Sequence, residues 1–188
     1  MKKKILITGG AGVIGSHVLE HLAEKTGAEL IVVDKLNYSC KGWQRLEEDG
    51  LDKHPRVKLI SWDLCMPFSS GIRKEIGEVD IIIHMAAESH VDRSIDHPLE
   101  FVTNNVNATV NLLEYARGLK NLENFFYFST DEVFGPALND SCYKEWDRHK
   151  PTNPYSASKS AAEGFCIAYE NTYQLPVMII NNMNVFGE

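Results

Sequence analysis

The sequence predicts an α/β protein built on a doubly wound parallel sheet of about six strands, with helices on both faces. Short apolar runs alternate with longer amphipathic stretches, which is the pattern of strands linked by crossover helices. The short runs are apolar at nearly every position, as is typical of strands buried on both faces. The 188 residues fit one domain, and no repeat or linker divides them.

The expected elements follow in chain order. Strands are predicted over 5–7, 30–33, 57–60, 81–83, 125–128 and 177–180. Helices are predicted after Gly12, from about Pro98 to Gly118 and from about Pro154 to Tyr173, because proline suits the first turn of a helix. Residues 38–49 and 69–76 show weaker helical patterns, and the charged stretch 136–152 is expected to form a surface loop.

The composition is that of a soluble globular protein, with 44% hydrophobic and 24% charged residues. A formal net charge of -7 argues against nucleic acid or an anionic membrane as the main partner, although a helix terminus can still bind phosphate. No apolar run approaches the length of a membrane span, and the run after the initial lysines is too short for a signal peptide. A cytoplasmic location is therefore expected.

The cysteines and histidines show no pattern of a metal site. No Cys-x-x-Cys pair occurs among the widely spaced cysteines, which are Cys40, Cys65, Cys142 and Cys166. We expect reduced thiols rather than a disulfide or a zinc site. The histidines between 84 and 97 lack the spacing of a tight ligand set, and His84 is expected to pack at a strand end. No metal is predicted.

A glycine-rich turn joins the first strand to the first helix. Gly9, Gly12 and Gly15 stand three residues apart within Thr-Gly-Gly-Ala-Gly-Val-Ile-Gly at 8–15. Glycine permits a sharp turn, close approach of the backbone to a pyrophosphate, and tight packing of the helix on the strand. Free N–H groups at the start of the helix would hold the phosphates. The turn, in this position, predicts a Rossmann fold that binds a dinucleotide.

Acidic residues follow the next strands where a dinucleotide would reach. Asp34 ends the second strand about 20 residues beyond Gly15, where a carboxylate accepts hydrogen bonds from the adenosine ribose and repels a 2′-phosphate. This favours NAD over NADP, and the alternative role for Asp34 is that of a turn residue. Asp63 and Leu64, just after the third strand, are expected beside the adenine, unless Asp63 simply closes a turn.

A tyrosine, a lysine and two carboxyl groups form the candidate catalytic set. Tyr155 and Lys159 are four residues apart on a predicted helix, so we expect the ammonium to lie beside the phenol and lower its pKa. Tyr155 would then act as a general base. Asp131 and Glu132 follow Thr130 at the end of the fifth strand. Hydride removal from a carbinol needs only the base, so the extra carboxyl groups indicate a further proton transfer, with water elimination as the obvious candidate.

These motifs together resemble the extended short-chain dehydrogenase/reductases, which combine a Thr-Gly-Gly-Ala-Gly turn with Tyr-x-x-x-Lys. Three longer stretches are similar to the dTDP-glucose 4,6-dehydratases within that family. They are His-Met-Ala-Ala-Glu-Ser-His-Val-Asp-Arg-Ser at 84–94, Ser-Thr-Asp-Glu-Val-Phe-Gly at 129–135 and Pro-Tyr-Ser-Ala-Ser-Lys at 154–159. The Thr-Asp-Glu element is the most specific part, because the related epimerases and decarboxylases usually carry other residues there.

The resemblance implies a role for each catalytic residue. Tyr155 would take the C4 hydroxyl proton as hydride passes to NAD, while Lys159 holds the nicotinamide ribose and Thr130 hydrogen-bonds the sugar's O4. Glu132 would remove the C5 proton, Asp131 would protonate the departing C6 hydroxyl, and hydride would return to C6. The implied activity is that of a NAD-dependent nucleotide-sugar 4,6-dehydratase, a hydro-lyase, with dTDP-glucose as the expected substrate.

The resemblance also implies a set of binding residues. Cofactor contacts are expected from Gly9, Gly12, Val13, Ile14, Gly15, Asp34, Lys35, Leu36, Asn37, Asp63, Leu64, Met85, Ala86, Ala87, Ser89, Asn104, Tyr155 and Lys159. Substrate contacts are expected from Ser89, Thr130 and Asn184.

The chain departs from the family pattern in a few residues and in length. Val185 replaces an asparagine that reaches the cofactor, and Asn37 and Asn104 stand where threonine is usual. Family members also continue past the position of Glu188 into a region that binds the nucleotide and caps the sugar. Residues 1–188 are therefore expected to be a dinucleotide-binding domain that carries the catalytic residues and lacks the C-terminal substrate-binding region.

The family resemblance suggests a homodimer through the helices at about 98–118 and 154–173, although the alternative for the first is packing on the sheet alone. Small residues at 157, 161 and 162 would permit close helix contact. Two other functions stay open. The chain could be an epimerase or decarboxylase on the same scaffold, or a NAD-binding module without turnover.

Overall fold

A computed structural model of the chain describes residues 2–38, 40–137 and 142–185. It contains a six-stranded sheet with the strand order β3-β2-β1-β4-β5-β6, and every pair of neighbouring strands is parallel. The strands are β1 (Lys4–Thr8), β2 (Glu29–Asp34), β3 (Val57–Ser61), β4 (Ile81–His84), β5 (Asn124–Thr130) and β6 (Val177–Asn182). All the predicted strands are present, and the doubly wound α/β prediction is confirmed.

The helices lie between the strands in chain order. They are α1 (Val13–Lys25), α2 (Gln44–Glu48), η1 (Leu51–Lys53), α3 (Ser70–Ile76), α4 (Val91–Asp96), α5 (Pro98–Phe101), η2 (Val102–Asn107), α6 (Ala108–Ala116), η3 (Asp131–Phe134) and α7 (Pro154–Tyr173). The start of α7 agrees with the sequence prediction, because Pro154 occupies its first turn and the Asn153 side chain accepts from the Ser156 N–H in a capping box. No helix within the described ranges combines the length and apolar character that a membrane span requires.

The helix expected over 98–118 is interrupted. After α5 ends at Phe101, η2 is a π-helix, and regular α-helix resumes in α6. Within η2 the Asn105 side chain is buried, accepts a hydrogen bond from the Glu88 N–H and donates to Ser158 Oγ. A widened turn of this kind commonly presents a side chain at a functional site. Periodicity alone does not reveal it, because its residues still read as helix.

Two of the weaker sequence predictions have different outcomes. The stretch 69–76 is helical, with the Ser69 side chain accepting from the Ile72 N–H as an N-cap. Among its described residues, which exclude 39, the stretch 38–49 is helical only over Gln44–Glu48, after Gly42 at a φ of 62°. The loop at 136–152 is confirmed for 136–137 and 142–152, and its residues 138–141 lie outside the described part.

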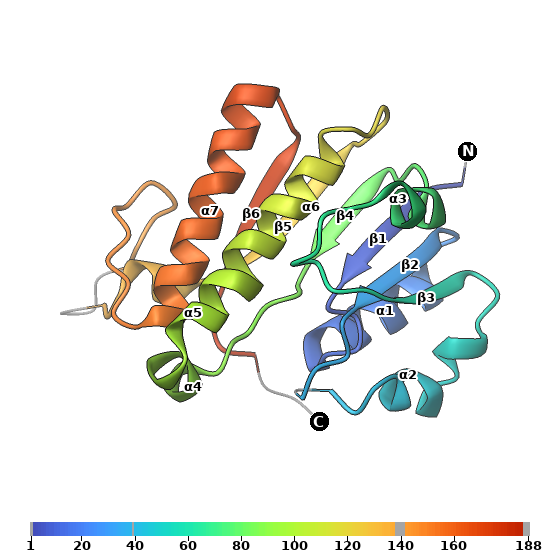
Figure 1. Cartoon of the computed structure of the whole chain (residues 1–188), viewed down its shortest axis with the longest axis horizontal. Coiled ribbons are helices and arrows are strands. Elements are labelled where there is room, and N and C mark those ends of the chain that lie inside the picture. Colours follow the sequence, from blue (N-terminus) through green and yellow to red (C-terminus); the bar gives the residue numbers. More distant parts are fainter. Residues whose placement is uncertain (1, 39, 138–141, 186–188) are drawn as a thin grey trace.

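Alternate residues of the central strands face two separate cores. Leu6 of β1 packs in one cluster with residues of α3, α6 and α7, whereas Ile5 and Ile7 pack in another with residues of α1 and α2. Figure 1 shows α6 and α7 in front of the sheet and α1 behind it. Because both faces of β1 are covered, every position of its central run is apolar.

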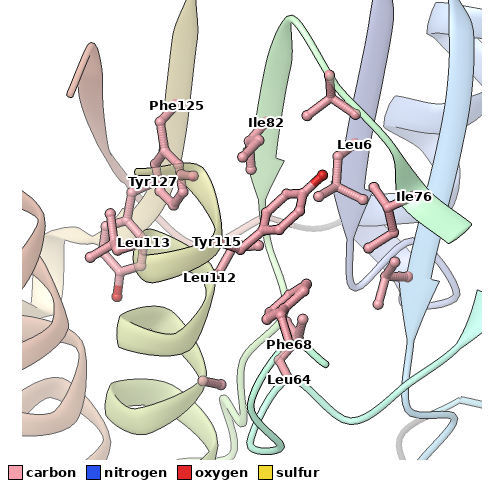
Figure 2. Packing of buried hydrophobic residues seen from close by; sticks show 14 of the residues in the cluster. Leu6, Leu64, Phe68, Ile76, Ile82, Leu112, Leu113, Tyr115, Phe125 and Tyr127 are labelled. Atoms are coloured by element: carbon pink, nitrogen blue, oxygen red, sulfur yellow. The ribbon is translucent and has the colours of Figure 1, made fainter. Parts of the chain in front are cut away.

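Aromatic rings pack against one another in the larger core. Figure 2 shows Tyr115 of α6 lying between Ile82 of β4 and Phe68, and the rings of Phe68 and Tyr115 stack at 4.8 Å between centroids. The buried Tyr115 hydroxyl donates to the carbonyl oxygen of Gly77 at 2.6 Å. This bond satisfies a polar atom that burial would otherwise leave without a partner.

The face of the sheet opposite α7 is only partly covered over β5 and β6. Phe126 and Phe128 alternate with residues of the larger core, and they are half-buried. Their register partners on β6 are Met178 and Ile180, and Met178 is 50% exposed. Within the described residues, the cluster formed with α1 and α2 reaches β4 but not these side chains.

The small-residue surface expected on α7 needs one correction. Ala157 and Ala161 are exposed, as a close helix contact would require. Ala162 is 0% exposed and belongs to the larger core, so its assignment to a helix–helix surface was wrong. It lies one residue from Ala161, which is about 100° around a helix and therefore faces the sheet instead of solvent.

Candidate active site

A pocket of about 290 Å³ lies where the strand order reverses, at the carboxyl ends of β1 and β4. Doubly wound sheets form their ligand crevice at this point, because the crossovers leave neighbouring strands in opposite directions. The pocket is lined by all the predicted cofactor residues except Leu36, namely Gly9, Gly12, Val13, Ile14, Gly15, Asp34, Lys35, Asn37, Asp63, Leu64, Met85, Ala86, Ala87, Ser89, Asn104, Tyr155 and Lys159.

The glycine-rich turn has no room for side chains at two positions. A Cβ atom on Gly9, whose φ is 74°, would lie 2.7 Å from the Ala86 nitrogen. A Cβ atom on Gly15 would lie 2.1 Å from the Gly9 carbonyl oxygen. Both clashes are with backbone, so they cannot be relieved by a rotamer change. The glycines therefore allow β1, β4 and the start of α1 to approach closely, as the sequence predicts.

The first turn of α1 is suited to a phosphate group. Gly12 is its N-cap, and no side chain caps the helix. Val13 and Ile14 follow it on the pocket wall with 48% and 37% of their surfaces exposed. N–H groups in the first turn of a helix have no partner within the helix, and they attract anions. The residues present therefore fit the pyrophosphate of a dinucleotide.

Asp34 and Asp63 accept hydrogen bonds from the backbone of their turns, and both also line the pocket. Asp34 Oδ2 accepts from the Ala11 N–H at 3.0 Å, and its Oδ1 accepts from the Leu36 N–H at 2.9 Å. Asp63 Oδ1 accepts from the Cys65 N–H at 2.9 Å. Each carboxylate oxygen can accept further bonds. The turn role and the predicted ligand role are thus compatible, and Asp34 braces the glycine-rich turn directly.

Lys159 and Tyr155 both line the pocket, and in this structure the ammonium contacts groups other than the phenol. The buried Lys159 ammonium donates to the carbonyl oxygen of Phe128 and lies 4.4 Å from the centroid of the Tyr127 ring. Burial lowers the pKa of Lys159 to about 8. Burial raises the pKa of Tyr155, and Glu132 and Asp131 raise it further, whereas a hydrogen bond with Thr130 opposes them. A spacing of four residues gives a shared helix face but does not decide what the ammonium contacts.

The Thr-Asp-Glu element lies beside this pocket in a separate hollow. Thr130 ends β5, and its Oγ1 accepts from the Glu132 N–H at 3.3 Å as the cap of η3. Asn153 Nδ2 donates to Glu132 Oε2 at 3.2 Å. Asp131 and Glu132 line the hollow with residues 135–137, 143 and 152. Thr130, Asp131 and Glu132 all act on the pKa of Tyr155, so the hollow and the pocket are close neighbours.

Three predicted residues line neither cavity, namely Thr130, which ends β5 between them, Leu36 and Asn184. Leu36 has a φ of 57° and is absent from the pocket lining. Asn184 is exposed in the segment after β6, whereas Asn182, at the end of β6, lines the pocket. The register of β6 beside β5 explains this, because Asn182 pairs with Thr130.

Two buried carboxylates were missed by sequence reasoning. Glu88, in the loop after β4, is 3% exposed and lines the pocket. Glu163 is also 3% exposed, and its Oε2 accepts from Ser129 Oγ at 2.6 Å and from Asn181 Nδ2 at 3.1 Å. Glu163 follows Lys159 by four residues, so it shares the lysine's helix face. The four-residue spacing was the only sequence signal for Glu163, and it is equally typical of a lysine and a glutamate paired on a solvent-exposed helix face.

The expectation that His84 packs at a strand end is confirmed. The ring is buried, and its nitrogens lie 2.7 Å from Thr8 Oγ1 and 2.9 Å from Thr109 Oγ1. Burial lowers the pKa of His84 to about 3, so the ring is neutral at pH 7. The described residues contain no group of three or more histidine, cysteine or acidic side chains placed to hold a metal ion.

Residues 6–188 match the protein family described as GDP-mannose 4,6 dehydratase. The chain belongs to this family.

Curated relatives of this chain have more specific descriptions than the family. The dTDP-D-glucose 4,6-dehydratase of Mus musculus is 40% identical over 186 residues, which cover 98% of this chain and 51% of the relative. A probable dTDP-glucose 4,6-dehydratase from Sinorhizobium fredii is 39% identical over 192 residues, which cover 98% of this chain and 54% of the relative. The chain thus spans about half the length of the curated relatives it matches.

Solved structures share the dehydratase-family fold at similar coverage. A dTDP-glucose 4,6-dehydratase from Streptomyces venezuelae, with NAD and TYD bound, has a TM-score of 0.84 and 36% identity, over 94% of this chain and 54% of that one. A UDP-N-acetylglucosamine 4-epimerase from Methanobrevibacter ruminantium, in complex with UDP-N-acetylmuramic acid, has a TM-score of 0.85 and 27% identity, over 100% of this chain and 57% of that one. The Rossmann-type fold is therefore shared by dehydratases and epimerases.

Proposed function

We propose that this chain is the NAD-binding and proton-transferring half of a nucleotide-sugar 4,6-dehydratase that acts on dTDP-glucose. The observation that carries the proposal is the placement of Thr130, Asp131 and Glu132, which all act on the pKa of Tyr155, while Thr130 also caps the turn holding the two carboxyl groups. A base and two further carboxyl groups thereby lie close together, although the carboxyl groups line a hollow beside the pocket. Oxidation alone needs only the base.

NAD is the proposed cofactor, and the pocket supports it. The uncapped first turn of α1 fits a pyrophosphate, and Asp34 at the end of β2 fits the ribose of adenosine. Tyr155 and Lys159 line the other end, where the nicotinamide ribose would lie. When bound, NAD would supply a hydride acceptor at C4 of the sugar and a hydride donor at C6.

Tyr155 would accept the C4 hydroxyl proton, with Thr130 hydrogen-bonded to the same oxygen. Because burial raises the pKa of Tyr155, the phenol needs a nearby positive charge before it can act as a base near pH 7. Lys159 lies one helical turn further on and carries such a charge. Release of its ammonium from the Phe128 carbonyl would bring that charge toward the phenol.

Glu132 and Asp131 would eliminate water from the 4-keto sugar. Glu132 would remove the proton from C5, which the neighbouring ketone acidifies, and Asp131 would protonate the C6 hydroxyl as it leaves. The two groups must start in opposite protonation states. The amide of Asn153, a donor, is matched to an ionised Glu132, as a base requires.

Turnover of dTDP-glucose deuterated at C4 tests the proposal. NAD-loaded protein should release a product that has lost one water and carries the label at C6. If neither dTDP-glucose nor UDP-glucose loses water even after the chain is joined to the remaining half of a relative, while the protein is folded and binds NAD, the dehydratase proposal fails. The Asp131→Asn and Glu132→Gln variants should lose the reaction. Glu145→Gln, a change at an exposed loop residue outside the hollow, is the matched control.

An epimerase is the second candidate, because UDP-sugar 4-epimerases share the fold at TM-scores of 0.85 and 0.83. Product mass separates the two, since an epimer keeps the mass of its substrate and a decarboxylase product loses carbon dioxide. A third outcome is a NAD-binding module without turnover. NAD binding without activity, rescued by joining the chain to the remaining half of a relative, would identify this case.

The proposed assembly is a homodimer through α5, η2 and α7. Leu99 is 79% exposed, Val102 is 47% exposed and Phe165 is 43% exposed on these elements, beside the exposed small residues Ala157 and Ala161. Apolar side chains exposed in this way favour a subunit contact. A cytoplasmic location is also proposed, because the four cysteines are free thiols, as is usual in a reducing compartment.

A further inference from the structure

Glu88 is a buried carboxylate that is surrounded by donors from the loop after β2. Its Oε1 accepts from Asn37 Nδ2 at 2.6 Å, and its Oε2 accepts from the Tyr38 hydroxyl at 2.9 Å. The Lys35 ammonium lies 3.3 Å from Oε1. A carboxylate that is only 3% exposed needs such hydrogen bonds and ion pairs to offset the free-energy cost of burying its charge. Glu88 is therefore an ionised group whose charge is directed at Lys35.

The Lys35 ammonium is occupied on both sides. Besides the Glu88 carboxylate, it contacts the Asn104 side chain, donating to Oδ1 at 2.9 Å. Lys35 directly follows Asp34, and both line the pocket. The other cationic residue among the described lining is Lys159, whose ammonium donates to the Phe128 carbonyl at the far end. The Asp34 end of the pocket thus contains a lysine whose positive charge is already neutralised.

A second cation nearby is held in the same way. The Arg93 guanidinium lies 4.0 Å from the centroid of the Tyr38 ring and pairs with Glu100 at 2.8 Å and 3.0 Å. It does not line the pocket. Around Asp34 the opposite charges within the pairs Lys35–Glu88 and Arg93–Glu100 cancel. The carboxylates of Asp34 and Asp63 therefore give this end of the pocket a net negative charge.

We propose that Glu88 is a specificity-determining residue that selects an adenosine ribose without a 2′-phosphate, by holding the Lys35 ammonium away from that position. The inference rests on the proposed binding of NAD. Asp34 repels a 2′-phosphate, but the lysine beside it would offset that repulsion if its ammonium were free. Glu88 removes this compensation, and its hydrogen bonds with Asn37 and Tyr38 keep it in place when the pocket is filled.

Titration calorimetry with NAD and with NADP, at one fixed salt concentration, tests the proposal on the chain itself. Glu88→Gln keeps the shape and removes the charge, so it should lower the Kd for NADP by about tenfold relative to the Kd for NAD. Adding Lys35→Met to the same variant should abolish the gain. Glu123→Gln is the matched control, because it breaks a lysine ion pair with Lys3 outside the pocket and should leave the ratio unchanged.

An equal weakening of NAD and NADP binding in Glu88→Gln would mean that Glu88 only supports the loop, and the proposal would be overturned. A gain for NADP that survives in the double variant would overturn the role given to Lys35. If Glu88→Gln does not fold, the Lys35→Met variant alone decides the question. It leaves the negative charge of Glu88 without its lysine partner, so the Kd for NADP should rise relative to the Kd for NAD. An unchanged ratio there contradicts the proposal. Failure of the unmodified chain to bind either nucleotide instead rejects the proposed cofactor.

Discussion

The pocket at the β1–β4 junction and the hollow at Asp131 and Glu132 are built in different ways. At its glycine-rich turn the pocket depends on main-chain geometry, because the glycine contacts leave no space for a Cβ atom and the helix start has no side-chain cap. The hollow is lined by one short turn and an adjoining loop. The difference predicts that cofactor binding depends on main-chain geometry at this turn, whereas the proposed proton transfers depend on a few replaceable side chains.

The largest effect is expected from Gly15→Ala. Its Cβ would lie 2.1 Å from the Gly9 carbonyl oxygen, so the turn or the start of α1 must move. We expect NAD binding to weaken by about a hundredfold or more, which is a loss of about 2.7 kcal/mol. Calorimetric titration measures it.

Gly164→Ala is the matched control, because a Cβ there meets nothing within 4 Å and alanine favours a helix interior by about 1 kcal/mol. It should bind NAD normally and unfold at a higher temperature. Normal NAD affinity in Gly15→Ala would show that the pocket does not depend on main-chain geometry.

Glu132→Gln tests the other side of the comparison. Loss of a general base reduces turnover by about 10²- to 10⁴-fold, while NAD affinity should stay within about twofold because Glu132 lies outside the pocket. Steady-state kinetics, in whichever form of the protein turns over, and a NAD titration give the two numbers. A parallel loss of NAD affinity would mean that the hollow and the pocket form one structural unit.

His84, which is buried at the end of β4, should make folding sensitive to acid. Its pKa is lowered to about 3 in the folded protein, against an ordinary value near 6.5 in the unfolded chain, so the unfolded chain binds the extra proton between these values. Stability is therefore fully present above pH 6.5 and falls by about 1.4 kcal/mol per pH unit below it.

Urea unfolding at pH 7 and pH 5 measures this dependence. In His84→Gln, which cannot titrate, the part of the pH dependence due to His84 should disappear. The same slope in the variant would assign the acid sensitivity to other groups. Because the ring contacts Thr8 of β1 and Thr109 of α6, a loss of baseline stability in the variant is expected and does not affect the slope.

The smallest effect contrasts two helix starts. The N-cap Ser69 of α3 accepts from the Ile72 N–H, whereas α1 has no side-chain cap. Ser69→Ala should cost about 1 kcal/mol of unfolding free energy without changing NAD affinity. Thermal unfolding and a NAD titration check both values, with Ser70→Ala as the control. A change in NAD affinity would break the distinction between a structural cap and an uncapped, ligand-facing start.

The six strands and the glycine-rich turn could be predicted from sequence because local signals decide them, whereas most of the other pocket-lining residues followed from the family resemblance. Apolar runs buried on both faces leave few alternatives to a parallel strand, and glycines spaced between strand and helix leave few alternatives to a phosphate-binding turn. The interruption at η2 could not be predicted in this way. It coincides with a hydrogen bond between the Asn105 side chain and the Glu88 backbone, a contact that no local pattern indicates.

The same reason explains why the contacts of the proposed catalytic residues could not be predicted. The spacing of Tyr155 and Lys159 correctly gives a shared helix face, but the ammonium contacts Phe128 on β5, and this contact depends on how α7 packs against the sheet. Likewise, the burial of Glu88 and Glu163 depends on neighbours from other elements. Hydropathy treats these glutamates as surface residues.

The sequence by itself determined the fold class, the strand order in the chain, the glycine-rich turn and the Thr-Asp-Glu element after β5, because each rests on contacts between near neighbours. Only the tertiary structure decided which charges are paired. It placed Lys35 against Glu88, Lys159 against a carbonyl, and the acidic turn in a hollow of its own. The physical reason is that burial and charge pairing are properties of packed elements, and packing brings together residues that no local pattern connects.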